Sequence, residues 1–373
     1  MLRHIAGENR TYLSLDDLSL RELAREDPKL FLARYSPPLL IDEIQYAPEL
    51  LPYIKLAIDE NRKNGEFWLT GSQQFHMMRG ISESLAGRIG IVNLLGFSQT
   101  EKCGQTSEAA PFLPSPRYEE KPAKSPDDIF HNIWQGSFPV PFVDQSVHVE
   151  FFFNSYLQTY LQRDIRELTR VGDLHQFTRF VRACAARTGQ ILNYSNLAKD
   201  VDISVMTAKH WLSLLEASFQ ILLVPPFHSN ITKRLIKTPK LYFLDTGLCA
   251  FLTGWLSPET VQQGAMRGAL FETYVITEII KSWWFAGRNP GFFYYRDKDG
   301  REIDLVLEQD NILYAVEVKS AATVKRSWAE IFSVLNRFPQ KKGARAVICL
   351  CDRPQPLDSL STAIPVSHIG LAL

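Results

Sequence analysis

The stretch Pro37–Glu43, which reads PPLLIDE, decides the fold of the first part of the chain. Its three apolar residues are typical of a strand buried in a parallel sheet, and the strand ends abruptly in Asp42 and Glu43. A second apolar strand, Phe67–Leu69, is followed by Thr-Gly-Ser at 70–72. Because parallel strands end at the same edge of a sheet, we expect these carboxylates and hydroxyls to lie close together.

Residues 11–100 alternate short apolar segments with helical stretches, and this pattern predicts a parallel α/β sheet. The strands that we predict from it are Thr11–Leu15, Leu39–Asp42, Phe67–Leu69 and Ile89–Leu95. The helices predicted between them are Ser19–Asp27, Glu49–Asn61 and Gln74–Leu85.

A strand that ends in Asp-Glu, next to a strand with a polar tip, is the arrangement of the Walker B and sensor strands in P-loop NTPases. There the Asp helps to hold Mg²⁺ through water, and the Glu orients the attacking water. The pattern predicts catalytic roles for Asp42 and Glu43 and nucleotide contacts for Thr70, Ser72 and Arg88. The alternative is structural, because carboxylates at strand ends often cap the next helix.

The sequence lacks the phosphate-binding loop that completes such a site. It contains no G-x-x-x-x-G-K-[ST] and not even one Gly-Lys dipeptide. The backbone amides and the Lys that would cradle the phosphates of ATP are therefore absent. We expect that residues 1–373 by themselves do not hydrolyse ATP.

These motifs resemble the AAA-type ATPases of bacteria and archaea that carry a C-terminal domain of unknown function, DUF4143. The resemblance implies ATP and Mg²⁺ as cofactors, a DNA-related role, and a first strand, phosphate loop and first helix that should precede YLSLDD. It covers nearly the whole chain and is carried by YLSLDD (12–17), PPLLIDEIQYAPEL (37–50), FWLTGSQ (67–73), SESLAGRIG (82–90), LLGFS (94–98), Gly136–Pro139, YLQRDI (160–165) and LDTGL (244–248).

The middle of the chain predicts a winged helix. Asn193–Leu215 reads as two short helices joined by a turn, with Ser204 as the N-cap of the second. The strands Phe219–Val224 and Leu241–Leu244 follow, separated by a basic segment. We predict DNA contacts for Lys209, Lys233, Arg234, Lys237 and Lys240. A wing that contacts protein or solvent is the alternative.

The last part of the chain predicts a helix, Ala269–Trp284, followed by three consecutive strands: Phe292–Arg296, Glu302–Glu308 and Ile312–Lys319. Asp304, Glu317 and Lys319 form D-x₁₂-E-x-K, the pattern of restriction-endonuclease-like nucleases. In those enzymes the carboxylates bind Mg²⁺, which lowers the pKa of the bound water, and the Lys positions that water. Glu272 is a candidate third metal ligand. A solvated Glu317–Lys319 ion pair, or an inactive domain, is the alternative.

The hairpin between the last two strands decides whether these carboxylates meet. A turn at Gln309–Asn311 would leave Asp304 roughly opposite Val316, within one residue of Glu317. We therefore expect both carboxylates and Lys319 to converge on one polar surface.

The fold class that follows is α/β, with an incomplete P-loop (AAA-type) parallel sheet, then a winged-helix domain and a restriction-endonuclease-like domain. The boundaries that we predict are 1–103 for the AAA-type core, 104–128 for a flexible linker, 129–188 for a helical lid or connector, 189–260 for the winged helix and 264–373 for the last domain.

Composition narrows the function classes. The 41 basic and 41 acidic residues cancel, so a DNA contact requires a local patch of charge. The five cysteines form no CxxC pair, and no apolar run approaches the ~20 residues of a membrane span. We expect a cytoplasmic protein without membrane contact, with DNA as a possible partner and self-association left open. It is an AAA-type ATP-binding protein, a Mg²⁺-dependent nuclease, or a non-catalytic binding module.

Overall fold

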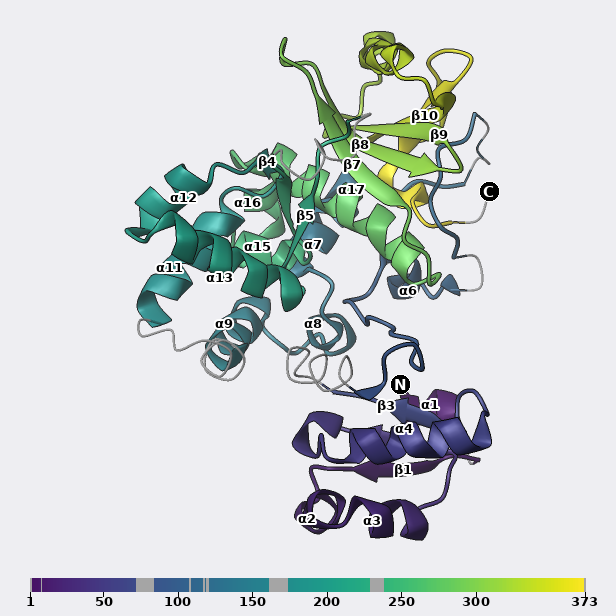
Figure 1. Cartoon of the computed structure of the whole chain (residues 1–373). Helices are drawn as coiled ribbons and strands as arrows, with labels where there is room; N and C mark the ends of the chain where they lie inside the picture. The colour runs from purple at the N-terminus through teal and green to yellow at the C-terminus, as the bar shows by residue number, and fades with distance from the viewer. Residues whose placement is uncertain are drawn as a thin grey trace. The chain divides into compact units, whose positions relative to one another are not determined.

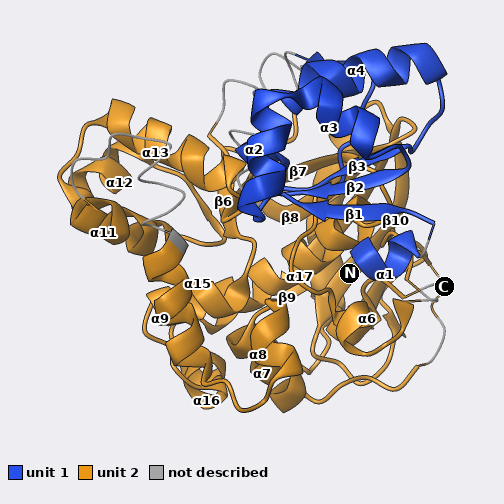
Figure 2. Cartoon of the chain, turned by 90° about the horizontal axis from the view of Figure 1, so that it is seen from below, with its two compact units in different colours: residues 1–92 blue, residues 93–373 orange. Residues whose placement is uncertain are grey.

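The computed structural model (Figure 1) describes residues 2–7, 9–71, 84–106, 109–116, 118, 121–160, 174–228 and 238–371. The chain divides into two compact units, residues 1–92 and residues 93–373 (Figure 2). Ser72 and most of the predicted helix Gln74–Leu85 lie outside the described residues. In the described residues the first unit contains one sheet and the second contains two, and each unit is described by itself.

The first unit is built on a parallel sheet of β1 (Thr11–Ser14), β2 (Leu39–Asp42) and β3 (Phe67–Leu69), in that order. Leu39 and Ile41 of the central strand are fully buried in one apolar cluster. The apolar run of PPLLIDE is thus the central buried strand of a parallel sheet, which confirms the prediction. The helices of this unit are α1 (Leu2–Ala6), α2 (Leu18–Glu26), α3 (Pro28–Arg34), η1 (Ile44–Tyr46) and α4 (Leu50–Asn61).

The fourth predicted strand, Ile89–Leu95, is wrong, because residues 89–95 form no regular structure. Three of their apolar side chains face solvent, with Ile91 51%, Val92 89% and Leu94 70% exposed. A strand needs a neighbour to satisfy its backbone groups. Among the described residues, β3 is the last strand of the sheet, and no further strand is present there to pair with residues 89–95.

The second unit begins with helices and a small antiparallel sheet in the order β4-β6-β5. Ser204 caps α13 by accepting from the N–H of Thr207, as the sequence predicts. The helix α11 and the strand β4 precede α12 and α13, and β5 and β6 follow them. The bounds are α7 (Pro126–Gln135), α8 (Pro139–Val143), α9 (Val149–Tyr160), α11 (Leu174–Ala185), β4 (Gln190–Ile191), α12 (Tyr194–Val201), α13 (Val205–Ala217), β5 (Ile221–Val224), β6 (Lys240–Phe243), α15 (Thr246–Leu252) and α16 (Pro258–Gln263).

A largely buried helix, α17 (Arg267–Trp284), leads into a six-stranded mixed sheet in the order β11-β12-β10-β9-β8-β7. A 3₁₀ helix, η4 (Arg326–Arg337), follows β9 in the sequence, and its Phe332 and Leu335 are buried against the sheet. The strands are β7 (Gly291–Arg296), β8 (Glu302–Gln309), β9 (Ile312–Lys319), β10 (Lys341–Cys349), β11 (Gln355–Pro356) and β12 (Ser361–Pro365).

Residues 104–125 of the predicted linker 104–128 form no helix or strand in their described part, and α7 begins at Pro126. The N–H of Phe112 donates to Ser282 Oγ over 2.9 Å, and the indole N–H of Trp283 donates to the Phe112 carbonyl over 2.7 Å. Phe112 itself is buried. Phe112 thus contacts α17 from within the stretch that the sequence predicts as a flexible linker.

None of the helices in the described part of the chain is long and apolar enough to cross a membrane.

Candidate functional site

Asp42 ends β2, and its carboxylate is held by hydroxyls from both neighbouring strands. Tyr12 of β1 donates from its OH to Oδ2 over 2.7 Å, and Thr70, directly after β3, donates from Oγ1 to Oδ1. The backbone N–H of Thr70 also donates to the carbonyl of Ile41 over 3.0 Å. The fold thus brings Asp42 and Thr70 together at the carboxyl edge of the parallel sheet.

Glu43 adopts a left-handed backbone conformation with φ of 58°. Non-glycine residues in this region cost about 1–3 kcal/mol and occur often at functional sites. The turn directs the N–H of Ile44 to the Thr70 carbonyl over 2.9 Å. Glu43 stands at the N-cap of η1 but makes no side-chain cap bond, and its carboxylate accepts from Gln45. The alternative in which these carboxylates cap the next helix is not what their described contacts show.

Arg88, a candidate phosphate contact, forms a two-point ion pair with Asp59 of α4. Its Nε lies 2.6 Å from Oδ1 and its Nη2 lies 3.2 Å from Oδ2. The bond from Arg88 lowers the pKa of Asp59. A nucleotide phosphate would have to compete with this carboxylate for Arg88.

The second candidate site is a group of four acidic side chains and two lysines, which we call the carboxylate centre. Lys240, the first residue of β6, extends its ammonium to Glu272 Oε1 of α17 at 2.8 Å, to Glu302 Oε1 of β8 at 2.5 Å and to Asp304 Oδ1 at 3.5 Å. On β9, Lys319 Nζ lies 2.5 Å from Oε1 of the remaining carboxylate, Glu317.

Two further contacts fix the carboxylate centre. Asp304 Oδ2 accepts from the backbone N–H of Val318 over 2.8 Å, which places this side chain against β9. The hydroxyl of Tyr242 donates to Glu272 Oε1 over 2.7 Å. The structure therefore brings together the predicted residues Asp304, Glu317 and Glu272, with Lys319 ion-paired to Glu317.

Burial dominates the electrostatics of the carboxylate centre. It raises the pKa of Glu317 to about 8 and that of Glu272 to about 7, and in both cases the neighbouring charge of Asp304 adds to the rise. Burial also raises the pKa of Asp304, against the opposing effect of Lys240. Burial alone would lower the pKa of Lys240, but the carboxylates around it outweigh this effect and raise it.

The hairpin register differs by one residue from the prediction. Asp310 and Asn311 both have positive φ, 51° and 60°, and form a two-residue turn that pairs Gln309 with Ile312. The ladder continues to Leu305 opposite Val316, so the next position outward sets Asp304 opposite Glu317. The prediction assumed a three-residue turn at Gln309–Asn311. The left-handed residues Asp310 and Asn311 instead close the hairpin in a two-residue turn.

Three family models match the chain in succession. Residues 1–103 match an AAA domain, residues 126–259 match a domain of unknown function, DUF8612, and residues 267–369 match the domain of unknown function DUF4143. The chain carries an AAA domain and a DUF4143 domain. This confirms the family resemblance inferred from the sequence motifs.

The relatives found by sequence have no described function. Uncharacterized proteins of Mycobacterium bovis and Mycobacterium tuberculosis are each 26% identical over 346 residues, which is 92% of this chain and 71% of theirs. A crystal structure of protein VC1899 from Vibrio cholerae aligns with 98% of this chain and 96% of its own, at 12% identity. Its TM-score of 0.20 is too low to support an argument about fold.

The carboxylate centre and the side chains that contact it come from two of these matched regions. Its four carboxylates belong to the DUF4143 domain, whereas Lys240 and Tyr242 belong to the preceding DUF8612 region. Lys240 is only 3% exposed, so its ammonium cannot lie along a DNA backbone in this conformation. We therefore remove Lys240 from the predicted DNA-contacting residues, because its side chain points inward to the carboxylates.

A divalent cation would find a partial set of ligands in the carboxylate centre. Glu317 is 7% exposed, and its Oε2 has no hydrogen-bond partner among the described residues. An oxygen of this kind suits a metal ion or a proton. Within the described residues, no three acidic, histidine or cysteine side chains are spaced as a ready metal cage. The donor chemistry fits Mg²⁺, but Lys240 already contacts three of the carboxylates.

The remaining DNA candidates are only partly described. Lys209 is exposed on α13, with its ammonium 5.3 Å from the centre of the Tyr194 ring. Lys233, Arg234 and Lys237 lie outside the described residues.

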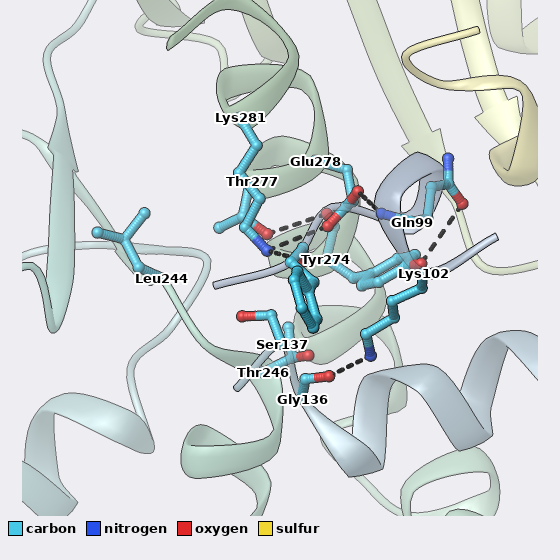
Figure 3. A pocket seen from close by; sticks show the side chains of 11 residues that line it. Gln99, Lys102, Gly136, Ser137, Leu244, Thr246, Tyr274, Thr277, Glu278 and Lys281 are labelled. Carbon is cyan, nitrogen blue, oxygen red and sulfur yellow. Dashed lines mark hydrogen bonds and ion pairs between the residues drawn. The ribbon is translucent and has the colours of Figure 1, made fainter. Parts of the chain in front are cut away.

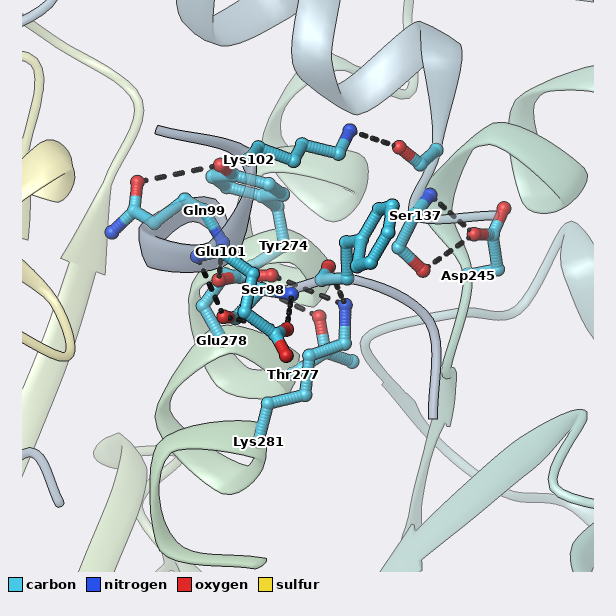
Figure 4. A network of polar contacts seen from close by, with 12 residues as sticks. Ser98, Gln99, Glu101, Lys102, Ser137, Asp245, Tyr274, Thr277, Glu278 and Lys281 are labelled. Atoms are coloured by element: carbon cyan, nitrogen blue, oxygen red, sulfur yellow. Dashed lines mark hydrogen bonds and ion pairs between the residues drawn. The ribbon is translucent and has the colours of Figure 1, made fainter. Parts of the chain in front are cut away.

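A third polar cluster joins three of the motifs that carry the family resemblance: LLGFS, Gly136–Pro139 and LDTGL. They meet around a small cavity beside α17, with room for roughly one water molecule (Figure 3). Ser137 donates from its N–H and Oγ to Asp245 Oδ2, over 2.6 and 2.7 Å, and Asp245 Oδ1 also caps α15 (Figure 4). A Cβ on Gly136 would lie 2.5 Å from Asp245, which explains the glycine there.

Charged groups of α17 hold the segment around Phe97 and Gln99, which belongs to the same unit. Glu278 Oε2 accepts from the N–H of Gln99 over 2.7 Å, and Lys281 Nζ donates to the Phe97 carbonyl over 3.1 Å (Figure 4). Lys102 donates to the Gly136 carbonyl and forms no ion pair with a carboxylate of the described residues. Burial, reinforced by the charge of Lys281, lowers its pKa to about 8.

Sequence reasoning missed Glu302 and Tyr242 and misassigned Lys240. The available signal was the alternation of Lys240 and Tyr242 in the otherwise apolar strand KLYF, because period two sends both side chains to one face. That these side chains meet α17 and β8 depends on contacts between distant segments, which the local pattern does not encode.

Proposed function

We propose that the AAA domain binds Mg·ATP at the carboxyl edge of the β1-β2-β3 sheet. In this proposal Asp42 holds the water shell of Mg²⁺, Glu43 orients the attacking water, and Thr70 contacts the γ-phosphate. The observation that supports it is the bond from Thr70 to Asp42 between the ends of adjacent parallel strands. The hydroxyl of Tyr12 keeps the Asp42 carboxylate aimed along this edge. Bound Mg²⁺ would neutralise charge on the phosphates.

The proposal includes a requirement for a phosphate-binding loop from outside residues 1–373. Such a loop supplies backbone N–H groups and a Lys for the β- and γ-phosphates, and this sequence contains no G-x-x-x-x-G-K-[ST] motif that would form it. An additional strand next to β3 would bring a loop to the edge where Asp42 and Thr70 lie. Without it, we expect ATP affinity weaker than roughly 1 mM, about −4 kcal/mol.

Calorimetry tests both parts. Residues 1–373 should show no Mg·ATP binding below about 1 mM. The same chain preceded by a strand, phosphate loop and helix of the AAA type should bind and hydrolyse ATP. In that longer chain, Asp42→Asn should remove hydrolysis, whereas Asp352→Asn, on an exposed loop of the second unit, should not. Micromolar binding by residues 1–373 contradicts the requirement for a loop, and a longer chain that binds no ATP contradicts the proposal.

The proposal also includes a DNA-related role for the middle of the chain. The order α11, β4, α12, α13, β5, β6, with the sheet order β4-β6-β5, supports a winged helix in which α13 would enter a DNA groove. Lys209 is exposed on that helix, and the basic residues Lys233, Arg234 and Lys237 precede β6 in sequence. Gel-shift or anisotropy measurements with duplex DNA test this role.

Mg²⁺-dependent nuclease activity is a second candidate function, favoured by the convergence of Asp304 and Glu317 with Lys319 beside them. In it, Asp304, Glu317 and Glu272 would hold Mg²⁺, and Lys319 would position the water whose pKa the metal lowers. Glu317 Oε2, which no described residue contacts by a hydrogen bond, supports this assignment. Cleavage of plasmid DNA by the full chain, present with Mg²⁺ and lost with EDTA and in Asp304→Asn, is the expected result. Equal cleavage by Asp304→Asn contradicts it.

A further inference from the structure

Lys240 reaches the carboxylate centre from a different structural element than the acids that it contacts. It is the first residue of β6 in the small antiparallel sheet, whereas Glu272 lies on α17 and Glu302 and Asp304 lie on β8. Its ammonium is within 3.5 Å of an oxygen from each of these three carboxylates. A single positive charge thus stands among converging anions, the position that a metal ion would take.

Glu317 provides independent evidence that the carboxylate centre is incomplete. Its Oε1 is bound by Lys319, but its buried Oε2 has no hydrogen-bond partner among the described residues. Leaving a buried carboxylate oxygen unpaired is costly, so such an oxygen is suited to an additional cation. Asp304, whose own Oδ1 lies 3.5 Å from Lys240 Nζ, stands opposite Glu317, one position beyond the Leu305–Val316 pair of the hairpin.

We propose that Lys240 is a built-in competitor of a divalent cation, so that the carboxylate centre takes up metal only when the Lys240 ammonium withdraws from Glu272 and Asp304. The competition is electrostatic, because a lysine and a divalent ion within a few ångströms repel each other strongly in a buried site. The inference rests on the proposed metal-dependent function of this centre and adds its regulation. Because Lys240 lies on β6, any displacement of this strand would alter metal affinity.

Metal binding by the full chain tests this inference without reference to cleavage. Calorimetric titration with Mn²⁺ should show affinity at least about tenfold higher in Lys240→Met than in the original chain, because a repelling charge is removed. Lys240→Arg keeps the charge and should bind metal as weakly as the original chain. The double variant Lys240→Met/Asp304→Asn should lose the gain. Equal affinity of Lys240→Met and the original chain overturns the inference.

A second variant covers the case in which Lys240→Met does not fold. Glu302→Gln weakens the hold on Lys240 while leaving Glu272, Asp304 and Glu317 in place, and the Glu302 side chain is 25% exposed. Competition predicts a rise in Mn²⁺ affinity of roughly threefold, although the variant removes a negative charge. If the acidic side chains only attracted the metal, the loss of one negative charge in Glu302→Gln would lower the Mn²⁺ affinity. Unchanged or lower affinity in Glu302→Gln therefore overturns the inference.

The metal titration and the nuclease assay separate the two proposals. Tighter Mn²⁺ binding in Lys240→Met without DNA cleavage supports the competition and contradicts the nuclease function. Cleavage by the original chain, with no affinity change in Lys240→Met or Glu302→Gln, supports the nuclease function and contradicts the competition.

Discussion

Two groups of acidic residues differ in what balances their charge. In the AAA domain, the hydroxyls of Tyr12 and Thr70 donate to Asp42, and no cationic side chain among the described residues forms an ion pair with it. In the DUF4143 domain, Asp304 and its neighbours surround the ammonium of Lys240. In our proposal the first site receives Mg²⁺ together with ATP, whereas the second already contains the ammonium of Lys240. Carboxylates at a strand end are thus a weak signal until their counter-charge is known.

The largest effect of this difference is expected on the free energy of unfolding. Lys240→Met leaves the buried Asp304 and the partly exposed Glu272 and Glu302 without their shared cation, and removal of one partner from a buried ion pair costs about 3–5 kcal/mol. Urea unfolding at pH 7 without divalent metal should show a loss of this size. Asp42→Asn, which retains one oxygen acceptor, should cost about 1 kcal/mol.

Lys319→Met is the matched control for Lys240→Met. Lys319 is 37% exposed and pairs with a single carboxylate, so its removal should cost no more than about 1 kcal/mol. Equal losses for the two lysine variants would contradict the view that Lys240 is the central counter-charge.

Lys102 offers a contrasting, partly buried lysine whose pKa moves in the opposite direction. No carboxylate of the described residues forms an ion pair with it, and burial lowers its pKa from 10.5 to about 8. Between these values the unfolded chain binds a proton that the folded chain does not bind. Its contribution to stability is therefore present above pH 10.5 and is lost as the pH falls to about 8, a change of roughly 3 kcal/mol.

The difference between the original chain and Lys102→Met isolates this effect from the other groups that titrate at high pH. The unfolding free energy of the original chain, relative to Lys102→Met, should decrease by that amount between pH 10.5 and pH 8. A constant difference across this range would show that Lys102 keeps an ordinary pKa in the folded protein.

The sequence predicts the parts of these sites that depend on local pattern. The buried strand that ends in Asp42, the adjacent strand before Thr70 and the hairpin carrying Asp304 and Glu317 all follow from apolar runs and turn residues. The role of Lys240 does not, because a lysine near a basic segment has the local pattern of a DNA contact. Its burial is determined by α17 and β8, which lie 32 and more residues away in sequence. The strand predicted at 89–95 fails for the same reason, since strand formation depends on a neighbouring strand.

A smaller effect is expected for the DNA surface proposed on α13. Lys209→Ala removes one exposed charge, so the slope of log affinity for duplex DNA against log salt should flatten by about 0.9. Lys29→Ala, at an exposed position of α3 in the first unit, should leave the slope unchanged. Equal slopes for the original chain and Lys209→Ala would assign Lys209 to solvent or to its contact with Tyr194.

The smallest effect is expected in the irregular segment 89–95. Val92 is 89% exposed, so Val92→Thr in residues 1–373 should change the unfolding free energy by no more than about 0.5 kcal/mol. Val347→Thr in β10 is the matched control, because Val347 is fully buried and should lose about 1–3 kcal/mol through an unsatisfied hydroxyl. In the longer chain with a strand beside β3, residues 89–95 gain the neighbour that they lack here, and Val92→Thr should become costly. A loss above about 1.5 kcal/mol in residues 1–373 alone would mean that Val92 is already covered, and the contrast between an open edge and a closed centre would then fail.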